Sequence, residues 1–174
     1  MTALPPAQLA PLAADPTLLN AITDSVHACM TMCSTRVRCV GVATVPSREP
    51  GSVTGMIGVH GSVSGFVTVN MAESVAMSAV AGLLQERFDR LTPQVIDGVG
   101  EITNMIAGGI KKNLGGSPWA FSHVTVPSVI VGRNYQIAYA RGLQYLAATF
   151  EHINEEVLLL DDRLIQVAIS LIRL

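Results

Sequence analysis

Hydrophobic side chains recur along the chain at two spacings, which predict where its helices and strands lie. Apolar residues three or four positions apart are typical of a helix with one buried face, whereas strict alternation is typical of a half-buried strand. The first spacing predicts three helices, at residues 16–34, 71–88 and 93–114. The second predicts six strands, at residues 36–45, 53–60, 62–70, 124–132, 143–151 and 163–174. The last segment also fits a short buried helix, but its alternating Ile165, Val167 and Ile169 favour a strand.

Residues with strong positional preferences mark the ends of the predicted helices. Asp15 and Pro16 suit the N-cap and the first turn of the first helix. Asn70, followed three residues later by Glu73, resembles a capping box that opens the second helix. The glycine pair at 115–116 stops the third helix.

The predicted elements belong to one domain of the α+β class. The His-Gly-Ser turn at residues 60–62 joins two of the strands as a hairpin, so neighbouring strands are expected to be antiparallel. Helices that bury one face against such a sheet give a two-layer domain. We therefore expect residues 17–174 to form a single domain with helices packed on a mostly antiparallel β-sheet. Residues 1–16, rich in alanine and proline, are expected to form a flexible leader.

Composition excludes two classes of partner. With 11 lysines and arginines against 13 acidic residues, the chain has no basic stripe to bind nucleic-acid phosphates. Mean hydropathy is high at +0.44, yet no run approaches the roughly 18 to 20 apolar residues of a membrane span. The start of the chain lacks the features of a secretory signal, and three cysteines are an odd number for a disulfide framework. We therefore expect a cytoplasmic protein that binds neither nucleic acid nor membrane.

The third predicted helix carries a line of polar residues. At about 100° per residue, Asp97, Glu101 and Asn104 fall within roughly 60° of arc on one face. The apolar residues of this helix, which include Met105, are expected to point away from the line and to pack on the sheet. Gly108, one turn beyond Asn104, would let another surface approach closely, at a cost of about 1 kcal/mol in helix stability. Because any surface helix has a polar face, this geometry alone is compatible with simple solvation as well as with a functional site.

The spacing of this line resembles the active-site signature of the CheC/CheX/FliY family of chemotaxis phosphatases. The likeness extends from Asp97 through Glu101 and Asn104 to Pro127. The segment VTGMIGVHGSVSGFVTVNM at residues 53–71 also resembles the hairpin of that family. The first predicted helix holds no second copy of the motif, so the chain is most similar to the CheX type.

The resemblance implies an activity and a role for each residue of the motif. Members of the family hydrolyse the aspartyl phosphate of a CheY-like response regulator, which ends a chemotaxis or related two-component signal. Glu101 is expected to pair with the active-site lysine of the regulator, and Asn104 to aim the attacking water. Asp97, Gly108 and Pro127 are expected to support the site. Magnesium is expected on the phosphorylated regulator, so this chain is expected to bind no metal or other cofactor.

A non-catalytic function is the alternative. The same helix could dock on a response regulator, or on a flagellar or signalling partner, without hydrolysing anything. The presence of both Glu101 and Asn104 favours catalysis, because docking alone would not need the amide.

The last two predicted strands carry apolar residues on both faces. In residues 143–151, Tyr145 and Ala147 alternate with apolar residues that face the opposite side. The helices can cover one face, so the other needs cover from a loop or from a second subunit. Proteins of the CheX type pair through their sheets, and the resemblance therefore favours a homodimer with a sheet edge or face at the interface. In a monomer, residues 1–16 or 152–162 would cover this surface.

Five other residues have simpler interpretations. Cys29 and Cys33, one turn apart, fit a metal or redox site, but their apolar surroundings favour burial. No role beyond core packing is assigned to them or to Cys39. Trp119 and Phe121 follow the third helix and fit either a partner contact or a cover for the sheet.

Overall fold

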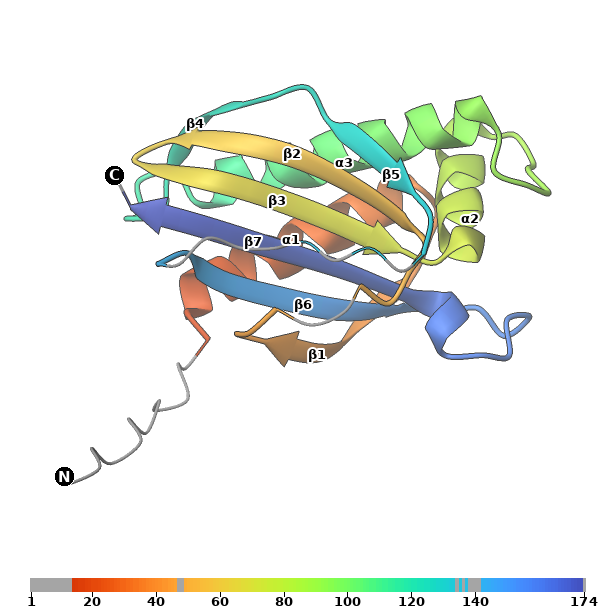
Figure 1. Cartoon of the computed structure of the whole chain (residues 1–174). Coiled ribbons are helices and arrows are strands. Elements are labelled where there is room, and N and C mark those ends of the chain that lie inside the picture. The colour runs from red at the N-terminus through yellow and green to blue at the C-terminus, as the bar shows by residue number, and fades with distance from the viewer. Residues whose placement is uncertain (1–13, 47–48, 134, 136, 138–141, 174) are drawn as a thin grey trace, which may run out of the picture.

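The structure of the chain is a computed structural model that describes residues 14–46, 49–133, 135, 137 and 142–173. Its helices are α1 (Pro16–Met32), α2 (Glu73–Leu84) and α3 (Pro93–Asn113), with a short 3-10 helix, η1 (Asp161–Arg163). Its strands are β1 (Val37–Ala43), β2 (Val53–Gly61), β3 (Val63–Met71), β4 (Phe121–Val124), β5 (Ser128–Val131), β6 (Gln144–His152) and β7 (Leu164–Arg173). Figure 1 shows these elements from red at the N-terminus to blue at the C-terminus.

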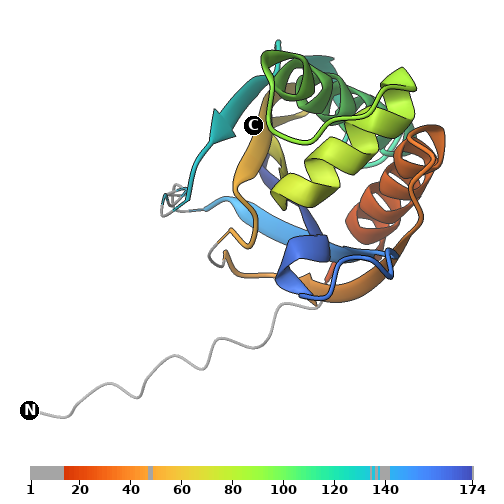
Figure 2. The same cartoon turned by 90° about the vertical axis from the view of Figure 1, so that its right-hand side faces the viewer.

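The described strands form one antiparallel sheet in the order β1-β6-β7-β3-β2-β4, and β5 also pairs with β2. The three helices lie on one side of this sheet (Figure 2). Val67 of β3 and Ile169 of β7 lie opposite each other in the sheet and are fully buried in the core. Burial of apolar surface between the two layers is the main favourable contribution to folding. The predicted α+β two-layer domain is therefore confirmed.

Two of the helices begin where the sequence predicts. Oδ1 of Asp15 accepts a 2.8 Å hydrogen bond from the backbone nitrogen of Thr17, which makes Asp15 the N-cap of α1. Pro16 follows it at a position where the missing N–H costs no helical hydrogen bond. The Thr92 hydroxyl caps α3 in the same way, with Pro93 in the first turn.

The predicted capping box at Asn70 is wrong. Asn70 still belongs to β3, where it pairs with Gln166 of β7, and α2 begins only after Ala72, without a side-chain cap. The buried Asn70 amide accepts a 2.6 Å hydrogen bond from the nitrogen of Gly51 and donates a 3.0 Å bond to its oxygen. Pairing between β3 and β7 continues to Met71, so Asn70 remains part of the sheet. Its two hydrogen bonds to Gly51 hold the segment before β2 in place.

The predicted strand at residues 124–132 is only partly right: β5 lies within it, but β4 overlaps it only at Val124 and otherwise occupies residues for which no strand was predicted. β4 pairs with the last residues of β2, and β5 pairs with its first residues. Pro127 lies between the two strands and has no N–H to donate to a ladder, which explains why a single strand does not run through this position.

The sheet face opposite the helices is partly buried within the single chain. Tyr145 and Ala147 of β6 pack with Ala168 of β7. On the same face, the hydroxyl of Tyr135, which follows β5, is hydrogen-bonded to the hydroxyl of Thr54 on β2. These residues therefore do not need a second subunit to cover them.

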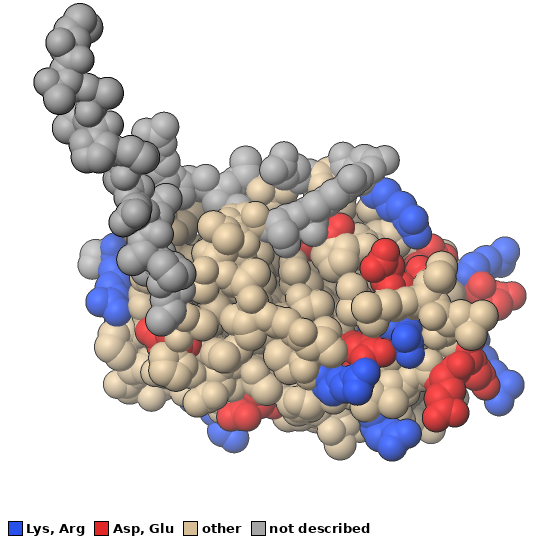
Figure 3. Space-filling model, turned by 90° about the horizontal axis from the view of Figure 1, so that it is seen from below, with Lys and Arg blue, Asp and Glu red and all other residues tan. Residues whose placement is uncertain are grey.

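One face of the molecule carries charged side chains of both signs (Figure 3). On the face shown in Figure 3, acidic and basic side chains are interspersed and do not form a field of one sign. In the part of the chain that the structure describes, no helix is long and apolar enough to cross a membrane. Residues 1–13 of the predicted leader lie outside the described residues, and residues 14–16 lead into α1.

Candidate active site on helix α3

Close packing against the sheet fixes the position of α3. The inner face of this helix carries the fully buried Val99, Ile102 and Ile106. The helix approaches the sheet closely at Gly55 of β2, where an added Cβ would lie 1.8 Å from the hydroxyl oxygen of Thr103. A larger residue at position 55 would force the helix away from the sheet.

The polar line predicted from the sequence lies on the outer face of α3. Its members Asp97, Glu101, Asn104 and Gly108 are all exposed. Among the described residues, the side chains of Asp97, Glu101 and Asn104 have no hydrogen-bond or ion-pair partner. Polar groups without an internal partner are free to bind those of another molecule. The structure thus places four of the five predicted site residues on one accessible face.

Pro127 lies beside this line, in the wall of an open hollow between α3 and β5. A Cβ on Gly100 would lie 3.8 Å from Cγ of Pro127 and 3.8 Å from Cγ2 of Val129, which is ordinary contact distance. The hollow has a volume of about 500 Å³ and is lined by Ile96, Asp97, Gly100, Glu101, Pro127 and Val129. The fifth predicted residue therefore shares one hollow with the two carboxylates of the line.

Gly108 has open space above it. An added Cβ would meet no other atom within 4 Å, so internal packing does not require glycine here. Because glycine weakens a helix by about 1 kcal/mol relative to alanine, its presence agrees with the expected need for room at this point.

Met105 of α3 only partly matches its predicted place, because it packs against the core without being fully buried. It follows Asn104 and is therefore turned by about 100° around the helix. The structure leaves Met105 half-buried, where it lines a second hollow together with Met32, the exposed last residue of α1. That angular offset from Asn104 is a signal that could have separated Met105 from the buried isoleucines.

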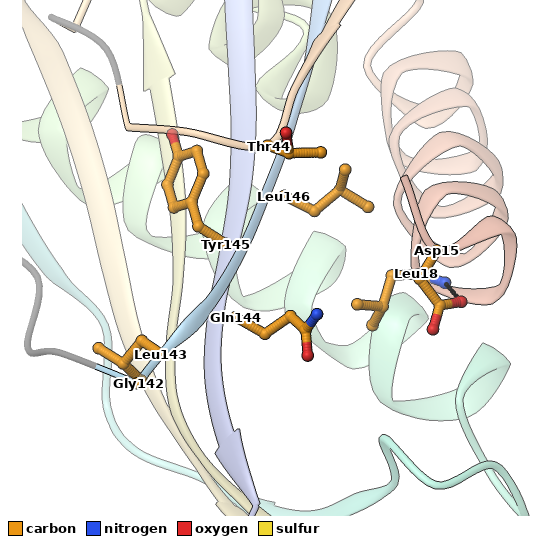
Figure 4. Close-up of a pocket in the computed structure, with 8 residues that line it drawn as sticks. All are labelled: Asp15, Leu18, Thr44, Gly142, Leu143, Gln144, Tyr145 and Leu146. Atoms are coloured by element: carbon orange, nitrogen blue, oxygen red, sulfur yellow. Dashed lines mark hydrogen bonds between the residues drawn. The ribbon is translucent and has the colours of Figure 1, made fainter. Parts of the chain in front are cut away.

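A separate pocket of about 230 Å³ lies at the start of α1 (Figure 4). Its rim includes the Asp15 carboxylate, whose Oδ2 accepts a 2.7 Å hydrogen bond from the indole nitrogen of Trp119. Burial acts to raise the pKa of Asp15, but hydrogen bonds from Trp119 and from the backbone of Thr17 and Leu18 outweigh it and lower that pKa below its usual value. The carboxylate of this pocket is therefore engaged in holding the fold.

Trp119 and Phe121 belong to the core. Each is only 4% exposed, which excludes a direct partner contact by either ring in this conformation. The guanidinium of Arg173 lies 4.3 Å from the centroid of the Trp119 ring. Of the two interpretations of these aromatic residues, cover for the sheet is the one confirmed.

Two of the three cysteines are buried between α1 and its neighbours. A hydrogen bond with Cys33 and burial raise the pKa of Cys29, so its thiol stays protonated. Core packing is confirmed for Cys29 and Cys33 but is wrong for Cys39, which is exposed on β1. Within the described ranges, no group of three or more His, Cys, Asp or Glu side chains could hold a metal ion.

An antiparallel sheet covered on one face by three helices, one of which presents a glutamate and an asparagine three residues apart, defines the class of the CheC/CheX/FliY proteins. The chain belongs to the family described as chemotaxis phosphatase CheX, whose sequence model matches residues 53–151. This range is more than half of the chain and contains all five predicted site residues. The resemblance that the motif indicated is therefore confirmed.

Solved structures of related proteins share the fold. The chemotaxis protein CheX from Vibrio vulnificus is 25% identical, with a TM-score of 0.73, and the match covers 88% of this chain and 98% of that one. A CheC-like superfamily protein from Shewanella sp. PV-4 is 24% identical, with a TM-score of 0.75, over 90% and 98% of the two chains. A chain of the CheX-CheY-BeF3-Mg+2 complex from Borrelia burgdorferi is 21% identical, with a TM-score of 0.70, over 91% and 97%. No curated protein sequence is a significant match.

Proposed function

We propose that the chain hydrolyses the aspartyl phosphate of a CheY-like response regulator and so ends a chemotaxis or related two-component signal. Its membership of a family of chemotaxis phosphatases supports this activity. The observation that carries the proposal is the position of Glu101 and Asn104, exposed and without a partner among the described residues, on the outer face of α3. The relative from Borrelia burgdorferi was solved as a complex of CheX with CheY, which supports a response regulator as the partner.

The reaction needs a water molecule in line with the bond that breaks. The water oxygen attacks phosphorus, the bond between phosphorus and the aspartyl oxygen breaks, and the regulator recovers its carboxylate while inorganic phosphate leaves. The amide of Asn104 does not take up a proton near neutral pH, but it can both accept and donate hydrogen bonds. It is therefore suited to hold the water in line rather than to act as a base.

Glu101 is suited to anchor the regulator. Its carboxylate can form charge-assisted hydrogen bonds with a lysine of the regulator. Three helical residues separate the anchor and the amide by about 4.5 Å along the axis, so the pairing of Glu101 sets the position of Asn104 over the phosphate. Asp97 and Pro127 support this arrangement, and Gly108 leaves room for the surface of the partner.

The metal in the reaction would belong to the regulator. Magnesium held there would neutralise charge on the transferred phosphoryl group, while this chain contributes the anchor and the amide. We place the reaction in the cytoplasm, together with its substrate.

Loss of phosphate from a panel of phosphorylated response regulators, with and without the chain, tests the proposal. Faster loss from at least one regulator is expected, with no acceleration of a regulator outside its signalling pathway. A regulator that binds but keeps its phosphate for as long as it does alone would show the non-catalytic docking module instead. If no regulator binds or loses phosphate faster, both functions are wrong.

A further inference from the structure

The second hollow borders the polar line on the side of α3 that faces α1. It has a volume of about 450 Å³, and both helices contribute to its lining. Ala28, Met32 and Met105 supply apolar surface, and Asp24 and Lys112 supply charges at its rim.

The floor of this hollow is fixed by close contact between the two helices. An added Cβ on Gly109 of α3 would lie 2.8 Å from the hydroxyl oxygen of Ser25 on α1, so glycine is what lets the helices meet. The amide of Asn113 donates a 3.2 Å hydrogen bond to that same oxygen. The hollow therefore exists before any partner arrives, as binding sites usually do.

The direction of the two helices brings one end of the hollow close to the candidate site. Ser25 of α1 meets Gly109, whereas Cys29, one turn later, donates a weak hydrogen bond to the backbone oxygen of Ile102. The helices are thus antiparallel, and Met32, a further turn along α1, lies at the end of the hollow nearer to Glu101.

The exposed methionine is what distinguishes this surface from an ordinary helix pair. Met32 is 62% exposed although its side chain is apolar. Methionine is unbranched and polarisable, so it adapts to the shape of a partner and is common on binding surfaces. Asp24 and Lys112 add charges of both signs, which favour one orientation of a bound protein over others.

We propose that the hollow between α1 and α3 receives an apolar side chain of the response regulator and selects the regulator that Asn104 acts on. The inference rests on the proposed function and deepens it. Because Met105 is adjacent to Asn104 on the helix, a protein that brings a phosphate to Asn104 also covers Met105 and the hollow beside it. α1 then contributes affinity and choice of partner, and α3 contributes the chemistry.

The substitution Met32→Glu tests whether α1 contributes binding of the regulator while α3 contributes the chemistry. It places a carboxylate in the apolar part of the hollow, and the exposure of Met32 makes a folding defect unexpected. Both KM for the phosphorylated regulator and Kd for the beryllofluoride-activated regulator should rise at least about tenfold, while kcat changes by less than about threefold. Met32→Ala, which adds no charge, should raise KM by a smaller factor. Leu84→Glu is the matched control, because Leu84 is the exposed last residue of α2 and lies outside the hollow.

The possible results separate the inference from the function on which it rests. If both Met32 variants keep the KM and Kd of the wild type while hydrolysis continues, the hollow has no part in binding and the proposed function stands. If Leu84→Glu weakens binding as much as Met32→Glu, the effect is not specific to the hollow. The inference is then wrong, and the proposed function again stands. If the wild type neither binds nor dephosphorylates any regulator, the proposed function is wrong and the inference is wrong with it.

Discussion

The indole nitrogen of Trp119 donates a 2.7 Å hydrogen bond to Oδ2 of Asp15, a residue 104 positions earlier in the chain. The other carboxylate oxygen of Asp15 caps α1 through the backbone of Thr17. One carboxylate therefore joins the start of α1 to the segment that leaves α3. These two helices form the hollow that we assign to the regulator, so the bond helps to hold that surface in place.

Trp119→Phe should lower the free energy of unfolding at neutral pH by more than about 1 kcal/mol, because it removes this hydrogen bond and also leaves a smaller ring in the core. The folded-state pKa of Asp15 lies below its usual value of 3.8, so the carboxylate stabilises the fold above that value. The contribution is lost as the pH falls through the lowered pKa. Urea unfolding of both proteins across the acid range in which they stay folded should show the difference shrinking, and a difference independent of pH would contradict it.

Asn104→Ala should slow dephosphorylation at least about tenfold, which is about 1.4 kcal/mol of transition-state stabilisation. Folding and regulator binding should stay nearly unchanged, because the exposed amide has no partner among the described residues. Single-turnover loss of phosphate at saturating protein measures the effect. Equal rates for the variant and the wild type would remove Asn104 from the mechanism.

Glu101→Ala should weaken association with the regulator as well as the rate. Loss of a charge-assisted hydrogen bond to a lysine corresponds to roughly 1.5 to 3 kcal/mol of binding free energy. A calorimetric titration with the activated regulator measures the change, and Glu101→Gln shows how much of it depends on charge. Affinity that does not change in either variant would exclude the anchoring role.

Gly108→Ala should raise the free energy of unfolding by about 1 kcal/mol, since alanine favours the helix and the added methyl group meets no atom within 4 Å. Gly108→Trp should instead reduce regulator binding, because the large ring would occupy the space left for the partner. Thermal unfolding and a binding titration measure the two effects. Normal binding by the tryptophan variant would show that the partner does not pass over this position.

We expect the protein to be a homodimer in solution. Among the described strands, β1 is an edge of the sheet, with Val40 47% and Val42 45% exposed. An apolar edge strand with free backbone groups favours pairing with a second copy. Light scattering behind size exclusion should give a mass twice 18.4 kDa, and Val42→Lys should shift it towards the monomer. A wild-type mass near 18.4 kDa at every micromolar dilution would show that the dimer does not form.

The fold could be predicted where local and long-range preferences agree. Asp15 and Pro16 have strong local preferences for the start of a helix, and a tight turn between two alternating segments specifies the β2–β3 hairpin. Asn70 shows the limit, because its local motif favours a helix cap while its place beside β7 favours the sheet. The sheet prevails because the buried amide satisfies both backbone groups of Gly51, a contact that only the folded chain creates.

The residues of the candidate site also differ in how far the sequence could predict them. Regular helix geometry places Glu101 and Asn104 on one face, so spacing alone predicted their shared exposure, whereas the family resemblance was needed to indicate a functional site there. Pro127 comes from another part of the chain, and only the family resemblance associated it with them before the hollow beside α3 was known. The hollow between α1 and α3 depends on the contact of Ser25 with Gly109 across the two helices, and no local sequence pattern indicates that contact.

The exposed line on α3 carries two carboxylates and an amide but no cationic side chain between Asp97 and Gly108. A small phosphorylated metabolite that reached this stretch alone would meet two carboxylates of like charge, and the lysines of this helix, Lys111 and Lys112, lie about two turns beyond Asn104. Under the proposed function, the lysine and the metal arrive only with the regulator, together with the bond to be broken. Small phosphorylated metabolites are then not hydrolysed, although no closed pocket keeps them away from Asn104. The reason is that the catalytic groups are divided between two proteins and act only while those proteins are in contact.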